Sequence, residues 1–559
     1  MQWLDWIVLI SSLSLIVVFG ILKNKKQENL QSYFLGDNSL AWHKVMFSVM
    51  ATQASAITFL SAPGQAFTDG MRFVQYYFGL PLAIIVVSLV FVPLYHKLKV
   101  VTAYEYLENR FDVKVRTFTA LLFLIQRGLA AGITIYAPSV VLSAIMGWNI
   151  YLTCFIMGIL VVLYTLSGGA KAVAQTQTHQ MIVILLGMAF ATYTIFHLLP
   201  SGFGLQDTLL IAGQAGKLNV ITTHFDLNDK YTLWSGLIGG FFLALSYFGT
   251  DQSQVGRYIA ASSKSQSVKG LLMNAIVKIP MQLGILFIGV ALYVFYIFNP
   301  QPLIFNPSIE KKLANSEYNL EYQTFQNKYY EIQNKQHELG EEIIKNKHNP
   351  TYLNKSTSEF KQLEIKKQSL KNESKEFISD KIKGVDTNDT NYIFLYFVLN
   401  NLPIGFIGLL IAVIFSASWS STSSELNALS STFVIDFYKR LFNNNASDKQ
   451  YVLVSKIATG VWGLLAIGFA FLATELQSLI EAVNLLGSLF YGTILGVFLS
   501  GILPFNLKSN HVFIGAIAAE ALVIYSYLNN HVAFLWLNLI GCIAVIVFAL
   551  LIKIAQKRD

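Results

Sequence analysis

The chain has 559 residues, of which 54% are hydrophobic, 14% are aromatic and only 13% are charged. This composition is too apolar for a soluble protein of this length and predicts an integral membrane protein. The formal net charge of +8 does not indicate nucleic-acid binding, because the basic residues lie in short loops between apolar runs. Cys154 and Cys542 each lie inside an apolar run, which excludes a disulfide framework and a cysteine metal site.

The apolar runs are long enough for helices that cross a hydrocarbon core of about 30 Å, and they lack the alternating pattern of a β-barrel. We therefore predict an all-α membrane protein with about 13 transmembrane helices. The first run, which begins near Trp3, has no basic start and no small-residue cleavage site, so we interpret it as a retained helix. The predicted spans are 4–22, 40–67, 72–96, 116–146, 149–166, 178–199, 231–259, 267–298, 391–435, 450–473, 478–502, 510–527 and 531–555.

Lysine and arginine are unevenly distributed between the two sets of alternate loops. With the N-terminus outside, the cytoplasmic loops and tail hold roughly 19 basic residues, and the opposite short loops hold only Arg72, Lys217 and Lys230. This positive-inside pattern predicts a multi-pass protein of the inner (plasma) membrane with an extracytoplasmic N-terminus and a cytoplasmic C-terminus.

Two predicted spans contain small and polar residues at membrane depth. The second carries residues 51–56 and 61–64, and the seventh carries residues 246–252. Unwound backbone inside a membrane persists only where it lines a cavity or a site. Because the two spans are five apart, spans 2–6 and 7–11 form an inverted pair if they are repeats. The predicted regions are an N-terminal helix and loop (1–39), a first repeat (40–200), a second repeat (231–298 and 391–502) and two C-terminal helices with a tail (510–559).

Residues 300–390 are rich in Lys, Glu, Asn and Gln, and they do not belong in a membrane. We interpret them as a soluble extracytoplasmic insert. Apolar residues at near-helical spacing precede and follow Pro350, which favours a helical hairpin that turns there. A disordered polar loop is the alternative, because the spacing is irregular. The insert could dock a protein partner or shade a solute entrance.

The ninth span ends in a segment, 417–427, with many hydroxyl side chains. Ala417, Ser420 and Ser421 are related by i, i+3 and i+4 and share one helix face. Two hydroxyls and the nearby carbonyl form a hard, neutral oxygen surface, which suits a small monovalent cation. Serines also hold helices together by close packing and hydrogen bonds, so the pattern alone leaves both interpretations open.

Several segments together resemble the solute:sodium symporter family, whose members transport sugars, sialic acid, proline, vitamins, iodide and monocarboxylates. The resemblance covers essentially the whole chain outside the insert. The residues of the matching motifs are closer to those of the vitamin, iodide and monocarboxylate branch than to those of the galactose carriers. It implies a LeuT-type fold of five plus five helices in an inverted repeat, with extra flanking helices. The matching segments are 55–59, 102–111, 167–173, 251–258 and 417–436.

This resemblance implies a site for the coupling ion, Na⁺, between the interrupted second span and the ninth span. Its ligands would be the following carbonyls and hydroxyls: Ala51, Ala54, Ala417, Ser420 and Ser421. In many members a Thr-Asp pair after the Gly-Gly motif resembles a second cation site, whereas this chain has Thr176-Gln177. An amide keeps an oxygen but loses the charge that would hold a second ion. We therefore expect one sodium ion per transport cycle.

The same resemblance places Thr58, Tyr77 and Ala244 where galactose carriers have sugar-binding Gln, Glu and Asn, which disfavours a galactose-like solute. Tyr247 matches a tyrosine that gates the solute site from the cytoplasm, and Lys278 matches a solute-contacting lysine. The expected solute-binding residues are Gln53, Thr58, Tyr77, Tyr247, Asp251 and Lys278.

Asp251 and Lys278 are charges inside predicted spans, and such groups face a cavity or a partner because their burial in lipid is costly. They could pair with each other or meet a solute of opposite charge, and Lys278 could instead extend to the cytoplasmic surface.

We predict a sodium-coupled secondary active symporter that imports a small organic solute or anion by alternating access, with no enzymatic activity. The expected partners are sodium, the solute and the lipid bilayer. A sensor with the carrier fold, or a membrane-anchored scaffold that acts through the insert, is the alternative. Uptake that stays independent of sodium in vesicles would favour either of these two.

Overall fold

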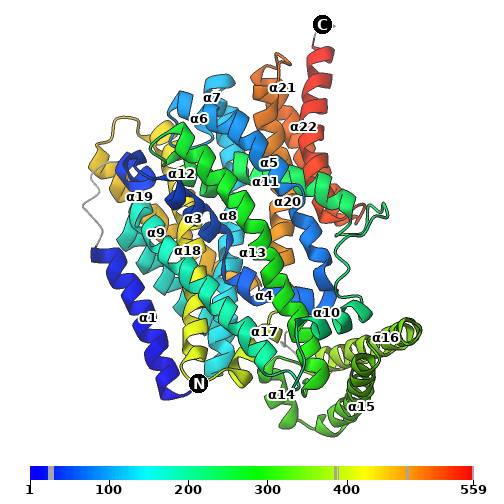
Figure 1. The fold of residues 1–559 in the computed structure, drawn as a ribbon. Coiled ribbons are helices and arrows are strands. Elements are labelled where there is room, and N and C mark those ends of the chain that lie inside the picture. The colour runs from blue at the N-terminus through cyan, green and yellow to red at the C-terminus, as the bar shows by residue number, and fades with distance from the viewer. Residues whose placement is uncertain (23–29, 383–386, 388, 474–477, 557–559) are drawn as a thin grey trace.

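The computed structural model describes residues 1–22, 30–382, 387, 389–473 and 478–556. Nearly all of these residues are helical, and their only β contact is an isolated bridge between Leu40 and Ala261. Figure 1 shows the N-terminus and the helices of the insert at one end of the bundle and the C-terminus at the other. The side chains of residues 16–17, 19–22, 31, 37, 167–176, 308 and 311 lie outside the description.

The helices fall in the order that the apolar runs predict. From the N-terminus to residue 197 they are α1 (Trp3–Leu22), α2 (Leu30–Leu35), η1 (Gly36–Asn38), α3 (Trp42–Gln53), α4 (Ala56–Asp69), η2 (Gly70–Tyr77), α5 (Leu80–Val86), η3 (Val87–Phe91), α6 (Val92–Leu98), α7 (Glu105–Arg110), α8 (Val113–Met146) and α9 (Ile150–His197). The next group, through the insert, is α10 (Leu205–Gln214), η4 (Ser235–Gly239), α11 (Gly240–Gly249), α12 (Gln252–Ile259), α13 (Lys264–Phe298), α14 (Pro307–Ala314), α15 (Asn319–Lys345) and α16 (Pro350–Lys381). The last group is α17 (Ile393–Asn401), α18 (Phe406–Thr432), η5 (Phe433–Phe442), α19 (Asp448–Leu472), α20 (Leu479–Ile502), α21 (Ser509–Leu528) and α22 (Phe534–Ala555).

Nine helical runs among the described residues are long and apolar enough to cross a membrane. Three shorter apolar stretches, Trp3–Leu15, Ile150–Leu166 and Ser235–Gly249, coincide with the first, fifth and seventh predicted spans. One long run, Ala56–Leu98, covers the third predicted span and the second half of the second. These twelve stretches account for the 13 predicted spans, and the prediction of an all-α membrane protein is confirmed.

Both predicted interruptions are present in the structure. The first lies between Gln53, the last residue of α3, and Ala56, the first residue of α4. The second lies between α11 and α12, where Asp251 caps α12 by accepting a hydrogen bond from the Ser253 N–H at 2.8 Å. The last carbonyls before each gap lose their helical donors and become available to other partners.

Two parts of the helical pattern differ from the prediction. The predicted ninth span, 391–435, is divided into the short helix α17 and the long helix α18. Pro403 removes a backbone donor there, and Gly405 has a φ of +90°, which continues neither helix. The fifth and sixth spans belong to one helical run, α9, whose side chains at 167–176, including the Gly-Gly motif and Thr176, lie outside the description.

Helix α18 lies at the centre of the bundle, and every residue from 410 to 432 is buried. It packs against α1, α3, α8 and α9. The side chain of Asp5 on α1 caps its start, because one carboxylate oxygen accepts from the Gly405 N–H at 2.6 Å. A Cβ at Gly408 would come within 2.1 Å of the Asp5 carbonyl oxygen, so α1 and α18 approach backbone to backbone. The serine-rich segment is therefore held inside protein rather than facing lipid.

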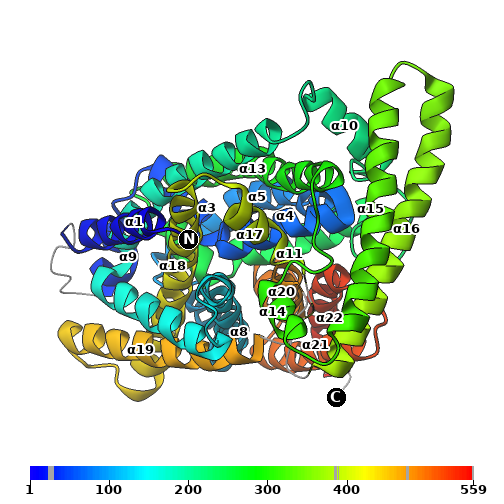
Figure 2. The ribbon, with the colours of Figure 1, turned by 90° about the horizontal axis from the view of Figure 1, so that it is seen from below.

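Residues 300–390 contain a helical hairpin made of α15 and α16. The turn lies at residues 346–349, where Asn349 accepts from the Tyr352 N–H at 3.2 Å and Pro350 occupies the first turn of α16. The hairpin packs against α10 and the end of α13. Figure 2 shows it along one edge of the bundle, with α17 closer to the middle. It therefore flanks the bundle and does not cover its centre.

Candidate sodium and solute site

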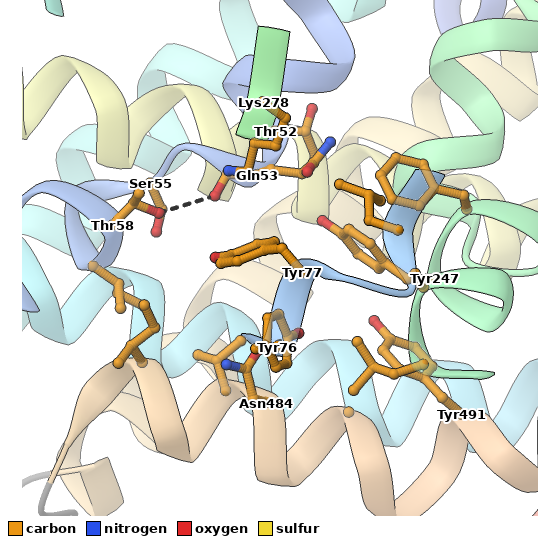
Figure 3. A pocket seen from close by; sticks show the side chains of 18 of the residues that line it. Thr52, Gln53, Ser55, Thr58, Tyr76, Tyr77, Tyr247, Lys278, Asn484 and Tyr491 are labelled. Atoms are coloured by element: carbon orange, nitrogen blue, oxygen red, sulfur yellow. Dashed lines mark hydrogen bonds between the residues drawn. The ribbon is translucent and has the colours of Figure 1, made fainter. Parts of the chain in front are cut away.

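A partly enclosed cavity with a volume of about 130 Å³ lies beside the two interruptions. Figure 3 shows its polar side chains converging from several helices. Side chains from the first interruption and from η2, α8, α11, α13, α18 and α20 line it. These include Thr52, Gln53, Ser55, Thr58, Tyr76, Tyr77, Arg127, Thr134, Ala244, Tyr247, Lys278, Glu425, Asn484 and Tyr491.

The end of α3 and the serine face of α18 lie against each other next to this cavity. The Thr52 hydroxyl donates to the Ser424 hydroxyl oxygen at 3.1 Å, which joins the two helices. Among the described residues, the buried Ser420 hydroxyl has no hydrogen-bond partner. The Ser421 hydroxyl donates to the carbonyls of Ser418 at 3.0 Å and Ala417 at 3.2 Å. The five expected sodium ligands are all buried: Ala51, Ala54, Ala417, Ser420 and Ser421.

Gln177 on α9 fills the space beside these serines. Its amide nitrogen donates to the Ser424 hydroxyl at 2.9 Å and to the Ser420 carbonyl at 3.3 Å. Its amide oxygen accepts from the Ser48 hydroxyl of α3 at 2.7 Å. The neutral amide thus joins α9 to α3 and α18 through both its donor and its acceptor, and its N–H group points at the Ser424 hydroxyl and the Ser420 carbonyl, next to the expected sodium ligands.

Five of the six expected solute-binding residues line the cavity, and Asp251 does not. Gln53 and Thr58 lie on either side of the first interruption, where the Thr58 hydroxyl donates to the Gln53 carbonyl at 3.2 Å (Figure 3). Lys278 on α13 is buried, and its ammonium lies 5.8 Å from the centre of the Tyr77 ring. Among the described residues, Lys278 has no ion pair or hydrogen bond. Its charge therefore faces the cavity without a carboxylate partner.

Asp251 pairs with Arg127, and not with Lys278. The Arg127 guanidinium donates to one Asp251 oxygen, which also accepts from the Tyr491 hydroxyl at 2.7 Å. Asp251 is buried and reaches these partners from the second interruption, between α11 and α12. Its carboxylate thus contacts Arg127 and Tyr491, and it also caps α12 at the second interruption.

Arg127 is a cavity residue that the sequence interpretation missed. It lies midway along α8 and also donates to Glu425 of α18 at 3.1 Å, while Thr134 donates to the other Glu425 oxygen at 2.7 Å. One buried arginine thus holds two buried carboxylates from different helices. An arginine in the middle of a predicted span was the available signal, since a charge at membrane depth needs a partner. Its partners, 124 and 298 residues away, could not be read from the pattern.

Residues that line the cavity make two side-chain hydrogen bonds between helical segments. Toward the insert, the Tyr76 hydroxyl donates to the Asn484 side-chain oxygen at 2.9 Å, joining η2 to α20. In the second interrupted segment, the Gln254 amide donates to the Tyr247 hydroxyl at 2.6 Å, joining α12 to α11. Both contacts depend on side-chain hydrogen bonds that a small helix displacement would break.

A bundle of membrane-length helices with two interruptions and a buried polar cavity beside them defines a secondary active transporter. The sodium:solute symporter family model matches residues 33–318 and 372–519, so the chain belongs to this family. It is a sodium-coupled symporter and not an enzyme.

The chain is 27% identical to the sodium/sialic acid symporter SiaT of Proteus mirabilis over 552 residues, covering 98% of this chain and 94% of that protein. It is 25% identical to human sodium-coupled monocarboxylate transporter 1 over 524 residues, covering 93% and 72%. Its fold matches a substrate-bound, outward-open Na⁺-coupled sialic acid symporter with a TM-score of 0.75 and 24% identity, covering 98% of this chain and 97% of that one. The LeuT-type fold of five plus five helices is thus established.

Proposed function

We propose that this symporter imports a small organic anion together with sodium, and that Lys278 binds the negative charge of the solute. The observation that carries this proposal is the buried ammonium of Lys278 at the cavity wall, for which the described residues offer no ion-pair partner. A buried charge without a partner is costly, and an anionic solute would supply the missing partner. The named relatives transport sialic acid and monocarboxylates, which are anions at neutral pH. Gln53, Thr58, Tyr77 and Tyr247 would contact the rest of the solute.

The charges at the cavity also favour an anion accompanied by one sodium ion. Arg127 and Lys278 carry two positive charges, and Asp251 and Glu425 carry two negative charges, so the empty site is neutral as a group. An anion and a sodium ion add no net charge. The loaded site can then switch from facing the outside to facing the cytoplasm without moving a net charge through the low-dielectric interior.

The sodium ion would bind between the first interruption and α18. Ala51, Ala54 and Ala417 would supply carbonyl oxygens, and Ser420 and Ser421 would supply hydroxyl oxygens. Two features support this assignment: the Ser420 hydroxyl, which has no hydrogen-bond partner in the described part of the chain, and the loss of helical donors after α3. Neutral oxygens suit a monovalent cation, which brings too little charge to require carboxylates.

We further propose that only one sodium ion binds per cycle. Gln177 directs its amide N–H groups at Ser424 and at the Ser420 carbonyl, so the neighbouring space already holds a positive dipole end. A second cation there would meet those N–H groups instead of a carboxylate.

Alternating access would follow from relative movement of the two repeats, 40–200 and 231–298 with 391–502. The Tyr76–Asn484 contact would open toward the outside and the Tyr247–Gln254 contact toward the cytoplasm. The termini lie at opposite ends of the bundle, with the insert at the N-terminal end (Figure 1). This arrangement supports an inner-membrane orientation with the N-terminus and the insert outside. The loops rich in Lys and Arg, together with the C-terminal tail, would then face the cytoplasm, as the positive-inside pattern requires.

Uptake into proteoliposomes tests this function. Purified protein would be offered labelled carboxylates, vitamins, amino acids and sugars, with and without an inward sodium gradient. We expect sodium-dependent uptake of at least one carboxylate and none of neutral sugars. Uptake of a neutral sugar in preference to every anion would refute the solute class. Uptake that is indifferent to sodium would refute the coupling.

A further inference from the structure

The outer end of the interrupted helix α4 is held by one lysine from a different segment. Lys217, in the loop after α10, donates its ammonium to the Thr68 carbonyl at 2.6 Å, in the last turn of α4. Its own carbonyl accepts from the Met71 N–H at 2.8 Å. A cation at a helix C-terminus stabilises the unpaired carbonyls and the negative end of the helix dipole. Lys217 thus caps the helix that begins at the first interruption.

The insert supplies the counter-charge for this lysine. Glu364 of α16 lies 3.7 Å from the Lys217 ammonium, and it accepts from the Tyr293 hydroxyl of α13 at 2.8 Å and from Gln336 of α15 at 3.0 Å. Its side chain is 26% exposed. Burial raises the pKa of Glu364, but the charges of Lys217 and Lys367, together with the hydrogen bonds from Gln336 and Tyr293, outweigh burial and hold the pKa below its usual range. The carboxylate is therefore ionised at neutral pH.

The hairpin is also fastened to the end of α13. Gln333 of α15 donates to the carbonyls of Tyr296 and Asn299, both at 2.9 Å. The ammonium of Lys217 lies 4.6 Å from the centre of the Tyr293 ring, so α13, α4 and the insert meet at one point. The carboxylate of the insert is thereby fixed in place and cannot follow Lys217 freely.

We propose that Lys217 and Glu364 are positioning residues through which the insert clamps the outer half of the interrupted helix, α4, and so sets how readily sodium and solute bind. Thr58 and the first interruption lie at the inner end of this same helix. If the outer end is loose, binding must pay the entropy of ordering α4, which weakens apparent affinity. This proposal rests on the proposed function, because it assumes that the first interruption binds the coupled ligands.

The test uses the full-length protein with three variants. Glu364→Gln and Lys217→Met remove the two charges. Glu373→Gln makes the same chemical change at an exposed position of α16, where Glu373 accepts from the Ser369 hydroxyl at 3.1 Å. Hydrogen exchange of the α4 backbone amides near Thr68 measures how firmly the end of α4 is held, and it does not require transport. The sodium concentration for half-maximal uptake reports its effect on binding.

We expect both clamp variants to speed exchange in the last turn of α4 several-fold and to raise the half-maximal sodium concentration several-fold, with maximal uptake largely retained. The effects of the two changes should add to less than their sum in the double variant, because both break the same Lys217–Glu364 contact. Exchange equal to that of Glu373→Gln, or faster exchange with unchanged sodium dependence, would overturn the proposal. Loss of sodium dependence in the unaltered protein would instead refute the proposed function and leave the exchange result interpretable.

Discussion

The amide nitrogen of Gln177 lies 2.9 Å from the Ser424 hydroxyl oxygen, so a neutral side chain occupies the space beside the serine face of α18. Ser48 completes the contact by donating to the amide oxygen at 2.7 Å. Because the amide is fully engaged, this position stabilises the packing of α3, α9 and α18 instead of leaving oxygens free for an ion.

Replacing this amide by a carboxylate tests the proposed stoichiometry. We expect Gln177→Asp to raise the ratio of sodium to solute, because a carboxylate beside Ser420 and Ser424 supplies the charge that a second cation needs. The ratio can be measured from the coupled flux of both labelled species in proteoliposomes. Gln177→Asn is the matched control and should keep the original ratio. An unaltered ratio in Gln177→Asp would leave the one-ion proposal without this support.

Removal of Arg127 tests the buried charge network. Arg127→Met leaves Asp251 and Glu425 as buried acids without their common partner, which we expect to cost about 3–5 kcal/mol of stability and to abolish uptake. Thermal unfolding of the purified protein and uptake provide the two measurements. Combining Arg127→Met with Asp251→Asn and Glu425→Gln should recover much of the stability. If Arg127→Met melts like the unaltered protein, the ion pairs do not hold these helices together.

Lys278 should matter for the solute and little for folding. We expect Lys278→Met to raise the solute concentration for half-maximal uptake by about tenfold or more, equivalent to about 1.4 kcal/mol of binding. The melting temperature should not fall, because the lysine has no ion pair among the described residues. The substitution also removes the cost of burying a charge without a partner. Lys269→Met, at an exposed position near the start of α13, is the control. Equal effects of both substitutions would contradict the assigned role.

The insert should become more stable as the solution becomes alkaline. Burial lowers the pKa of Lys367 to about 8, whereas an unfolded chain keeps a lysine pKa of about 10.4. Between these values only the unfolded chain binds the proton, so stability from this group rises with pH, by at most about 1.4 kcal/mol per unit. Hydrogen exchange of α16 at about pH 7.5 and about pH 9.5 measures this change. Lys367→Met should remove this pH dependence. If the variant and the unaltered protein respond identically to pH, Lys367 does not titrate in this interval.

Local patterns were sufficient for the helices and the interruptions. Small and polar residues around Ala54 and Thr250 marked both gaps, because a continuous apolar helix has no reason to carry them at that depth. The same reasoning failed at the ninth span, where Pro403 and Gly405 lie inside an otherwise apolar run and divide it. Apolar composition indicates which residues lie within the membrane, but it does not indicate where one helix ends and the next begins.

Pairing between distant charges could not be derived from one sequence. Asp251 and Lys278 were both recognisable as intramembrane charges, yet the partner of Asp251 is Arg127, and Lys278 has none among the described residues. Which charges meet depends on how α8, α12 and α18 pack, and periodicity does not encode that arrangement. The clamp between Lys217 and Glu364 is a further contact of this kind, made across 147 positions of the chain.

The most direct test of the account is the sodium dependence of uptake by Ser421→Ala. If sodium binds between the first interruption and α18, loss of this hydroxyl removes a neutral ligand, and the half-maximal sodium concentration should rise several-fold. Ser418→Ala, whose hydroxyl donates instead to the Thr134 carbonyl at 2.8 Å, is the neighbouring control and should keep the original value. A sodium dependence in Ser421→Ala that matches the unaltered protein would contradict the proposed sodium site.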